Sequence, residues 1–304
     1  MARALRAGWA AGPRPRLRRP ASRDYNASVP ELPEVETIVR TCRRRLEGRR
    51  IVAFRSLWPK NVAPGARAVG QALTGQTITR LTRRGKHIVF QLTDGWLLVH
   101  LRMSGRLEWG ADHERPPAHV RAVWELDDGR RLLLCDARKF GRIIYTRDLA
   151  ATTAGLGPEP LARDFTVQAL DRLLRTRRRQ LKPLLLDQTV IAGLGNIYAD
   201  EVLFRAGLHP LRRSDELTAA EIVRLHKAIR HVLRQAIAAH GTTIDWIYPG
   251  GWMQKRLQVY GRTGQPCRRC GTPIVALRVA QRGTHVCPRC QPLGGRRRRR
   301  RTVS

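Results

Sequence analysis

The chain has 304 residues and carries 58 Lys and Arg against 24 Asp and Glu, which gives a formal net charge of +34. This length is enough for two ordinary domains with a core each. So basic a chain indicates a polyanionic partner, first of all nucleic acid, although a ribosomal or histone-like protein would have the same charge. No run of about 18 apolar residues is present, so we expect no membrane-spanning helix.

Residues 1–29 contain seven Arg and a single acidic residue, and their apolar residues follow no period. We expect this segment to be disordered. An Arg-rich, acid-poor N-terminus is also typical of an organellar transit peptide. A third interpretation is a mis-assigned start, because GTG, a valine codon, also initiates translation in bacteria and Val29 stands directly before Pro30.

The stretch Pro30-Glu31-Leu32-Pro33-Glu34-Val35-Glu36 follows this segment. Apolar residues then recur at helical spacing as far as Leu46, and Gly48 follows two positions later. A proline in the first turn, acids near the positive end of the helix dipole and a closing glycine predict an amphipathic helix. This prediction accounts for the residues from Pro33 onward and leaves the Pro30-Glu31 pair unexplained.

After this helix the apolar period changes from about 3.6 residues to about 2, which is typical of strands. The candidate strands are residues 51–58, 77–82, 87–92, 96–101, 120–126, 131–135 and 142–146. The helical period then returns, and the candidate helices are residues 165–175, 181–187, 196–206 and 218–239. Many short strands followed by helices predict an α+β fold, with an N-terminal β-sandwich and flanking helices before a C-terminal helical domain.

Four of the six cysteines form two Cys-x-x-Cys pairs, Cys267 with Cys270 and Cys287 with Cys290. Four thiolates at this spacing predict one tetrahedral zinc ion, Zn2+. Because all four ligand positions are filled, the zinc is expected to be structural and to hold a small β-hairpin, of which residues 274–279 form one strand. The pattern suits a reducing compartment, and the two remaining cysteines are left for the core.

Two further stretches have patterns that could bind phosphate. Gly193 and Gly195 precede Asn196 at the start of a candidate helix. The plain interpretation is a glycine turn with an Asn N-cap, but the amides of such a turn and of a helix N-terminus also form an anion site. Lys86 lies in the basic turn Arg83-Arg84-Gly85-Lys86-His87, where it is either a solvated charge or functional.

These motifs, in this order over residues 30–291, resemble the formamidopyrimidine-DNA glycosylase family: bifunctional DNA glycosylase/AP lyases with a helix-two-turns-helix domain and a zinc-finger hairpin. The resemblance implies that the secondary amine of Pro30, once terminal, is the nucleophile that forms an iminium with the sugar. It also implies that Glu31 supplies protons to the sugar ring and that Lys86 acts at the lesion phosphate. An amide-bound Pro30 has no usable lone pair, so a retained extension would leave a non-catalytic DNA-binding protein.

The same resemblance assigns contacts with double-stranded DNA that contains damaged bases. Met103 and Phe140 are expected to fill the gap left by a flipped nucleotide, since an apolar wedge replaces the lost stacking. Arg138 would bond the orphaned base, and Lys139 stands where the family commonly has arginine. The remaining expected DNA contacts are Lys182, Asn196, Tyr198, Arg262 and, on the zinc hairpin, Arg282 in preference to Arg278.

We therefore expect a glycosylase that removes oxidised purines, namely 8-oxoguanine and formamidopyrimidines, and that cleaves the abasic site by β,δ-elimination. An endonuclease VIII-like enzyme for oxidised pyrimidines is the alternative, although residues 32–36 and Met103 favour the first branch. Residues 244–258 look shorter than in the best-known bacterial relatives, which favours hydantoins and formamidopyrimidines over 8-oxoguanine as substrates. The protein is expected to be a monomer without membrane contact, cytoplasmic on the bacterial nucleoid, or organellar if residues 1–29 are a transit peptide.

The expected domain boundaries follow from these patterns. Residues 30–150 would form the catalytic β-sandwich, residues 151–262 the helical DNA-binding domain and residues 263–292 the zinc finger. Residues 293–304 form a basic tail with six consecutive arginines, whose simplest role is additional non-specific affinity for DNA.

Overall fold

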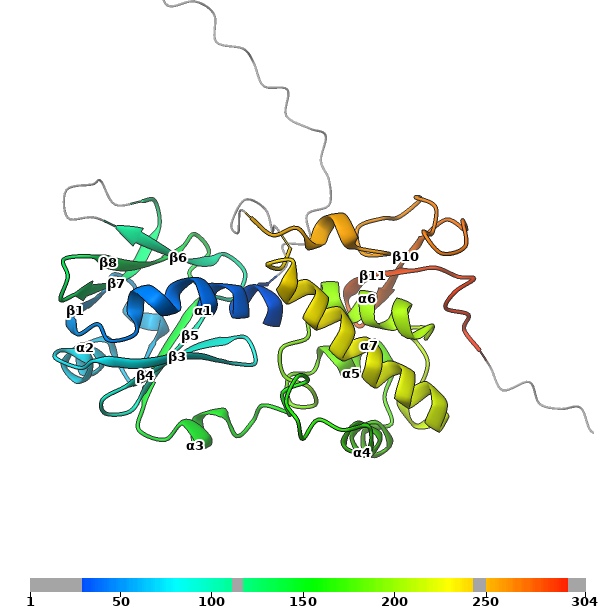
Figure 1. Ribbon diagram of the computed structural model, residues 1–304, viewed down its shortest axis with the longest axis horizontal. Helices are drawn as coiled ribbons and strands as arrows, with labels where there is room; N and C mark the ends of the chain where they lie inside the picture. Colours follow the sequence, from blue (N-terminus) through cyan, green and yellow to red (C-terminus); the bar gives the residue numbers. More distant parts are fainter. Residues whose placement is uncertain (1–28, 111–116, 243–249, 295–304) are drawn as a thin grey trace, which may run out of the picture.

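The computed structural model describes residues 29–110, 117–242 and 250–294. Figure 1 shows a β-rich part and a helical part side by side, with helix α1 (Leu32–Leu46) reaching from the first toward the second. The predicted extension before residue 29 and nearly all of the basic tail lie outside the described residues, as does the start of the 244–258 segment.

The β-rich part contains two sheets. The first has four strands in the order β1-β7-β8-β6, with the bounds β1 (Ile51–Ser56), β7 (Val120–Leu126), β8 (Arg131–Asp136) and β6 (Gly105–Gly110). The second has five strands in the order β2-β9-β5-β4-β3, with the bounds β2 (Val62–Ala63), β9 (Arg142–Thr146), β5 (Trp96–His100), β4 (His87–Leu92) and β3 (Ile78–Arg84). The strands pair in antiparallel fashion, apart from the short parallel pair of β2 with β9.

The inward-facing apolar side chains of the two sheets form one core. Strand β4 contributes Ile88 and Phe90 from one sheet, and β8 contributes Leu132 and Leu134 from the other. Alternate residues of a strand point to the same face, so each of these pairs faces the opposite sheet. The predicted β-sandwich is confirmed.

The helical part has a second core, built mainly by four helices. Their bounds are α4 (Val167–Arg177), α5 (Leu181–Leu186), α6 (Asn196–Ala206) and α7 (Ala219–Ala238). The short helix α3 (Leu149–Thr153) precedes them, and single turns of 3-10 helix occur at η1 (Pro59–Asn61), η2 (Ser214–Glu216) and η3 (Met253–Arg256). The hairpin of β10 (Val275–Val279) and β11 (Arg282–Val286) packs with β11 against α6. The α+β class is therefore confirmed.

Most predicted elements agree with the observed ones. The predicted helix 196–206 is α6, and the predicted strands 87–92, 120–126 and 142–146 are β4, β7 and β9. Strands β2 and β6 and helices α2 (Ala66–Leu73) and α3 were missed. Glycines at both ends of β6 look like loop residues, and Gly70 in the middle of α2 weakens its helical signal.

Helix α1 is shared by the two parts of the molecule. Its later turns bury Val35 and Leu46 in the sandwich core, whereas Leu32 in the first turn is buried in the helical core. The backbone N–H of Leu32 donates to the carbonyl of Gly193 at 3.0 Å. A Cβ on Gly193 would lie 2.7 Å from the Leu32 side chain, so only glycine permits this approach. The start of α1 is thereby fixed at the junction.

Candidate active site and DNA interface

A cleft of about 460 Å³ lies at the junction of the β-rich and helical parts. The predicted site residues that line it are Glu31, Lys86, Met103, Arg138, Asn196 and Arg282. Val29 also lines the cleft, and Pro30 beside it is buried. Residues from α1, two strand turns, the start of α6 and the zinc hairpin therefore meet around one space.

Glu31 caps the N-terminus of α6 from 164 residues away in the sequence. Its carboxylate accepts hydrogen bonds from the backbone N–H groups of Gly195 at 2.7 Å and Ile197 at 2.8 Å. The N-cap of α6 is Gly195, so the interpretation of Asn196 as the cap was wrong: a distant carboxylate takes the free amides that an Asn side chain would otherwise satisfy. A Cβ on Gly195 would lie 2.4 Å from the Glu31 carboxyl carbon, which explains the glycine.

The environment of Glu31 favours its protonated form. Burial raises the pKa of Glu31 to about 7, the nearby Lys86 works in the opposite direction, and Glu34 adds to the rise. Burial also lowers the pKa of Lys86, and Glu31 opposes that shift. A carboxyl group that titrates near neutrality can deliver a proton under physiological conditions.

Glu34 fixes the same turn of α1 to the helical part. Its Oε2 accepts the backbone N–H of Glu31 at 3.0 Å. Its Oε1 accepts the hydroxyl of Tyr198 at 2.5 Å and the backbone N–H of Thr242 at 2.7 Å. Because the Tyr198 side chain is fully buried, it has no surface for the predicted contact with DNA. That prediction was wrong, and Tyr198 holds α6 against α1 instead.

Lys182 has a structural position in place of the predicted phosphate contact. Its side chain is fully buried, and its ammonium forms an ion pair with Asp200 at 2.6 Å. The ammonium also donates to the Gly283 carbonyl and to Thr284 Oγ1, each at 2.8 Å. Asp200 accepts in addition the backbone N–H of His285 at 2.8 Å. The side chain of Lys182 is therefore engaged in binding β11 to α5 and α6.

The zinc hairpin is placed so that Arg282 reaches the cleft. Asn196 donates its amide to the Gly283 carbonyl at 3.0 Å, next to the exposed Arg282. The tight turn before β11 has left-handed backbone at Ala280 and Gln281, with φ of 46° and 60°. Non-glycine residues seldom adopt this conformation, which suits a turn whose shape matters.

The turn that carries Lys86 is fixed by Glu159, from the segment after α3. The Glu159 carboxylate accepts the backbone N–H of Gly85 at 2.6 Å and the guanidinium groups of Arg83 at 2.7 Å and Arg84 at 3.1 Å. Burial raises the pKa of Glu159, but the two arginines and the Gly85 amide outweigh it and hold the pKa below its usual value. Lys86 is thereby held opposite Glu31.

Two loops of the sandwich present the predicted wedge residues. Met103 lies between β5 and β6, and Arg138, Lys139 and Phe140 lie between β8 and β9. Phe140 is 50% exposed, with the Arg138 guanidinium 5.1 Å from its ring centroid. The ammonium of Lys139 lies 4.2 Å from the ring of Trp58. A wedge that inserts into DNA needs apolar and cationic side chains at loop tips, and these two loops provide them.

Arg262 is partly used by the chain itself. Its guanidinium donates to the carbonyl of Gln258 at 2.6 Å and to that of Pro266 at 2.9 Å. These bonds tie the segment before the zinc unit to the zinc unit. A contact of Arg262 with phosphate stays a prediction.

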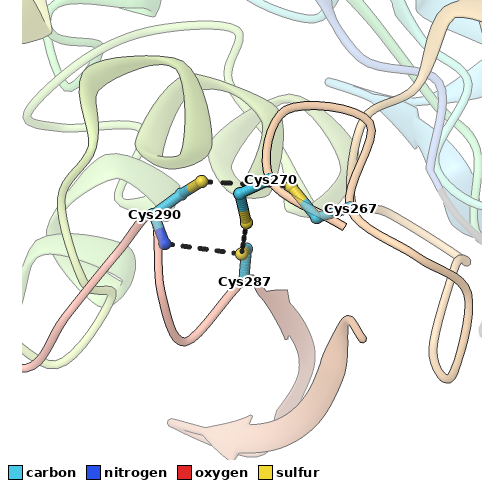
Figure 2. Close-up of side chains that lie close together, drawn as sticks. All are labelled: Cys267, Cys270, Cys287 and Cys290. Carbon is cyan, nitrogen blue, oxygen red and sulfur yellow. Dashed lines mark hydrogen bonds between the residues drawn. The ribbon is translucent and has the colours of Figure 1, made fainter. Parts of the chain in front are cut away.

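The four predicted zinc ligands converge, as Figure 2 shows. Their sulfur atoms all lie within 4.8 Å of one another, with 3.9 Å between those of Cys267 and Cys290 and 3.5 Å between those of Cys270 and Cys287. A tetrahedral ion with Zn–S bonds of about 2.3 Å needs sulfur atoms about 3.8 Å apart. The residues therefore fit one structural zinc ion.

Several groups that shape the site were not predicted, chiefly the buried Ser104, Asp136, Asp200 and Glu201 and the half-buried Glu159. For Asp200 and Glu201 a signal was available, because two adjacent acids interrupt an otherwise apolar helix. Such groups are seldom buried without partners. Glu201 indeed accepts the backbone N–H groups of Val259 and Tyr260, each at 2.9 Å.

The chain combines a sandwich domain, a helical domain and a four-cysteine zinc unit around a basic cleft. This combination places it in the class of zinc-containing DNA-binding proteins. Three family models match the chain: the formamidopyrimidine-DNA glycosylase N-terminal domain at residues 29–143, the H2TH domain of the same glycosylase at residues 156–247, and the zinc finger found in FPG and IleRS at residues 264–293. The chain therefore belongs to the formamidopyrimidine-DNA glycosylase family.

Individual relatives agree with this assignment. The formamidopyrimidine-DNA glycosylase of Herpetosiphon aurantiacus is 46% identical over 272 residues, which cover 86% of this chain and 100% of that protein. The one of Enterococcus faecalis is 41% identical over 278 residues, covering 88% and 99%. A solved structure of the Lactococcus lactis enzyme with DNA that contains an AP site has a TM-score of 0.81 at 38% identity, covering 86% of this chain and 99% of that one. A structure of MutM with DNA that contains carbocyclic 8-oxo-G has a TM-score of 0.82, also at 38% identity, covering 86% and 100%.

No helix within the described ranges is long and apolar enough to cross a membrane.

The raised pKa of Glu31 predicts a pH dependence of stability. Since burial raises this pKa from 4.5 to about 7, the folded protein holds a proton that the unfolded chain has already lost between these values. The stability of the wild type relative to Glu31→Gln should therefore fall as the pH rises from 4.5 to about 7 and level off above it. Denaturant unfolding of both proteins at pH 5, 6, 7 and 8 measures this difference.

Glu125→Gln, which removes a carboxylate that is 38% exposed on the sandwich, is the matched control. A relative stability that rises with pH would mean that the α6 amides stabilise the Glu31 anion more than burial opposes it, and would contradict this account.

Removal of one zinc ligand should detach the hairpin without unfolding the sandwich. Cys287→Ala is expected to lose the zinc ion and to lower DNA affinity at least about 10-fold, because Arg282 is then no longer held at the cleft. Metal analysis and a fluorescence-anisotropy titration with duplex DNA measure both effects. Cys135→Ala, at a buried cysteine of the sandwich, should keep both zinc and affinity. Full zinc content in Cys287→Ala would rule out this ligand set.

Proposed function

We propose that the protein removes oxidised purines, 8-oxoguanine and formamidopyrimidines, from double-stranded DNA and cleaves the resulting abasic site by β,δ-elimination. The observation that carries this proposal is Glu31, a buried carboxyl group with a pKa of about 7 on the wall of the cleft, adjacent to Pro30. A secondary amine and a proton donor side by side are what imine-forming base excision needs.

The reaction starts with the amine of Pro30. The generic pKa of an α-amino group is about 7.7–8.0, so a useful fraction of the amine is unprotonated near neutrality. Its lone pair attacks C1′ of the sugar and the bond to the damaged base breaks. The base departs with the electron pair of that bond and takes up the proton that the attacking nitrogen loses. Glu31 donates a proton to the sugar ring oxygen, the ring opens, and an iminium joins Pro30 to C1′. The iminium acidifies C2′, so the phosphates leave by successive β- and δ-elimination.

This chemistry requires Pro30 to be the first residue of the active protein. In a Val29–Pro30 peptide bond the proline nitrogen is an amide and has no usable lone pair. Val29 itself lines the cleft, so any residue attached before Pro30 occupies space that the substrate sugar needs. The family match that begins at residue 29 supports an active chain that starts at Pro30.

The DNA-facing residues have separate roles in this proposal. Met103 and Phe140 enter the gap that the displaced nucleotide leaves, and Arg138 bonds the orphaned partner base. Lys86 neutralises the phosphate at the lesion, close to Glu31. Asn196 binds a phosphate that flanks the displaced nucleotide, Arg282 contacts the backbone near the lesion, and Arg262 binds a further phosphate. Lys139 adds a cationic contact with the DNA.

The comparisons support purine lesions over pyrimidine lesions. Two solved relatives at 38% identity are complexes with DNA that contains carbocyclic 8-oxo-G or Fapy-dG.

We further propose that the protein acts as a monomer, since one chain supplies the whole cleft. We also propose that it works on the bacterial nucleoid in the cytoplasm, since its relatives are bacterial and its substrate is DNA. A non-catalytic DNA-binding protein is the second candidate, and it requires residues 1–29 to stay attached.

Excision assays on matched duplexes test the proposal. The natively expressed protein should release 8-oxoguanine and formamidopyrimidine opposite cytosine and leave phosphates at both ends of the gap. Oxidised thymine in the same sequence should be released at least about 10-fold more slowly. Faster release of the oxidised pyrimidine would support the endonuclease VIII-like alternative, and binding without any release would support the non-catalytic one. A hydantoin duplex in the same series tests the preference suggested by residues 244–258.

A further inference from the structure

The buried carboxylate of Asp136 joins the two loops that carry the wedge residues. Asp136 ends β8 and is fully buried. Its Oδ1 accepts the hydroxyl of Ser104 and the backbone N–H of Arg138, the latter at 3.2 Å. Its Oδ2 accepts the backbone N–H of Gly141 at 2.7 Å. Ser104 follows Met103 directly, and its hydroxyl also accepts the Arg138 N–H at 3.1 Å.

Both loops have shapes that need such support. Arg102 and Lys139, each next to a wedge residue, have left-handed backbone with φ of 54° and 61°. Left-handed backbone at residues other than glycine is sparsely populated and persists when surrounding bonds impose it. A Cβ on Gly141 would lie 3.2 Å from Asp136 Oδ2, so the second loop passes close to the carboxylate.

The chemistry of the bonds requires a carboxylate at this position. An ionised carboxylate only accepts hydrogen bonds, and here it receives three donors. The amide of Asn would turn its NH₂ group toward one of these donors and leave a buried N–H or O–H without a partner. Asp136 also accepts the Arg121 guanidinium at 2.8 Å, but through its backbone carbonyl, which a side-chain substitution leaves intact.

We propose that Asp136, with Ser104, is a positioning residue that holds the Met103 loop and the Arg138–Phe140 loop as one unit. The apolar wedge of Met103 and Phe140 and the base-contacting Arg138 then enter the duplex together. This proposal rests on the proposed function. It assigns Asp136 to displacement of the damaged nucleotide and not to the bond-breaking chemistry at Pro30 and Glu31. Its loss should therefore impair substrates that must be unstacked and spare those that are already accessible.

Two substrates separate these steps. The first is a duplex with 8-oxoguanine opposite cytosine, where the base must leave the stack. The second is a single-stranded oligonucleotide with a preformed abasic site, which needs no unstacking and reports the imine chemistry by borohydride trapping. Asp136→Asn should lower kcat/KM on the duplex by about 10- to 100-fold, the range for a buried charge-assisted hydrogen bond. Trapping on the single strand should stay within about 2-fold of the wild type.

Ser104→Ala is the milder variant, because it removes one bond to Asp136 and leaves the carboxylate in place. It should show the same selective loss with a smaller size, about 3- to 10-fold on the duplex. Both variants should also reduce the preference for cytosine over adenine opposite the lesion, since Arg138 is no longer fixed.

Asp128→Asn is the matched control. The Asp128 side chain accepts the backbone N–H of Arg130 at 3.1 Å in the turn between β7 and β8. Its activity on both substrates should equal that of the wild type.

Equal losses on both substrates would show that Asp136 acts through general folding and would overturn the proposal. Unchanged activity of both variants on the duplex would overturn it as well. A wild-type protein that traps no single-stranded abasic site would count against the proposed function itself, so the two failures are distinguishable.

Discussion

Two buried carboxylates at the N-terminus of α1, Glu31 and Glu34, hold the two parts of this molecule together. Glu31 accepts the amides at the start of α6, and Glu34 accepts the Tyr198 hydroxyl and the Thr242 amide in the segment that follows α7. Burial of two neighbouring acids is unfavourable unless their oxygen atoms are fully bonded. Satisfying them fixes the position of Pro30, whose two neighbours Val29 and Glu31 line the cleft, and leaves Glu31 with a raised pKa.

Helix α6 organises the opposite wall of the cleft. Its successive faces contact different elements: Tyr198 reaches α1, Asp200 binds the zinc hairpin, and Glu201 accepts the amides of the segment at residues 258–260. Phe204 packs in the small core beside the zinc ligands, with the Arg269 guanidinium 4.5 Å from its ring centroid. One helix thus sets the relative positions of the start of α1, the hairpin that carries Arg282 and the segment at residues 258–260.

Local patterns in the sequence were sufficient for the sandwich, the longer helices and the grouping of the four cysteines, because period and Cys spacing depend on near neighbours. The site was only partly predictable, because its decisive bonds join distant residues. Nothing near Asn196 shows that Glu31 takes over its capping role, and nothing near Lys182 shows that Asp200 holds it in the interior. Strand β6 was missed for a similar reason, since the glycines at its two ends weaken the local strand signal although it pairs with β8 along its whole length.

The central claim is that the amine of Pro30, placed by Glu31 and Glu34, is the nucleophile. Borohydride trapping of the natively expressed protein on a duplex with 8-oxoguanine opposite cytosine, followed by mass spectrometry of the adducted peptide, tests it most directly. The account predicts one covalent adduct, on the nitrogen of an N-terminal Pro30. An adduct on a lysine such as Lys86, or intact DNA binding without any adduct and with residues 1–29 still attached, would contradict it.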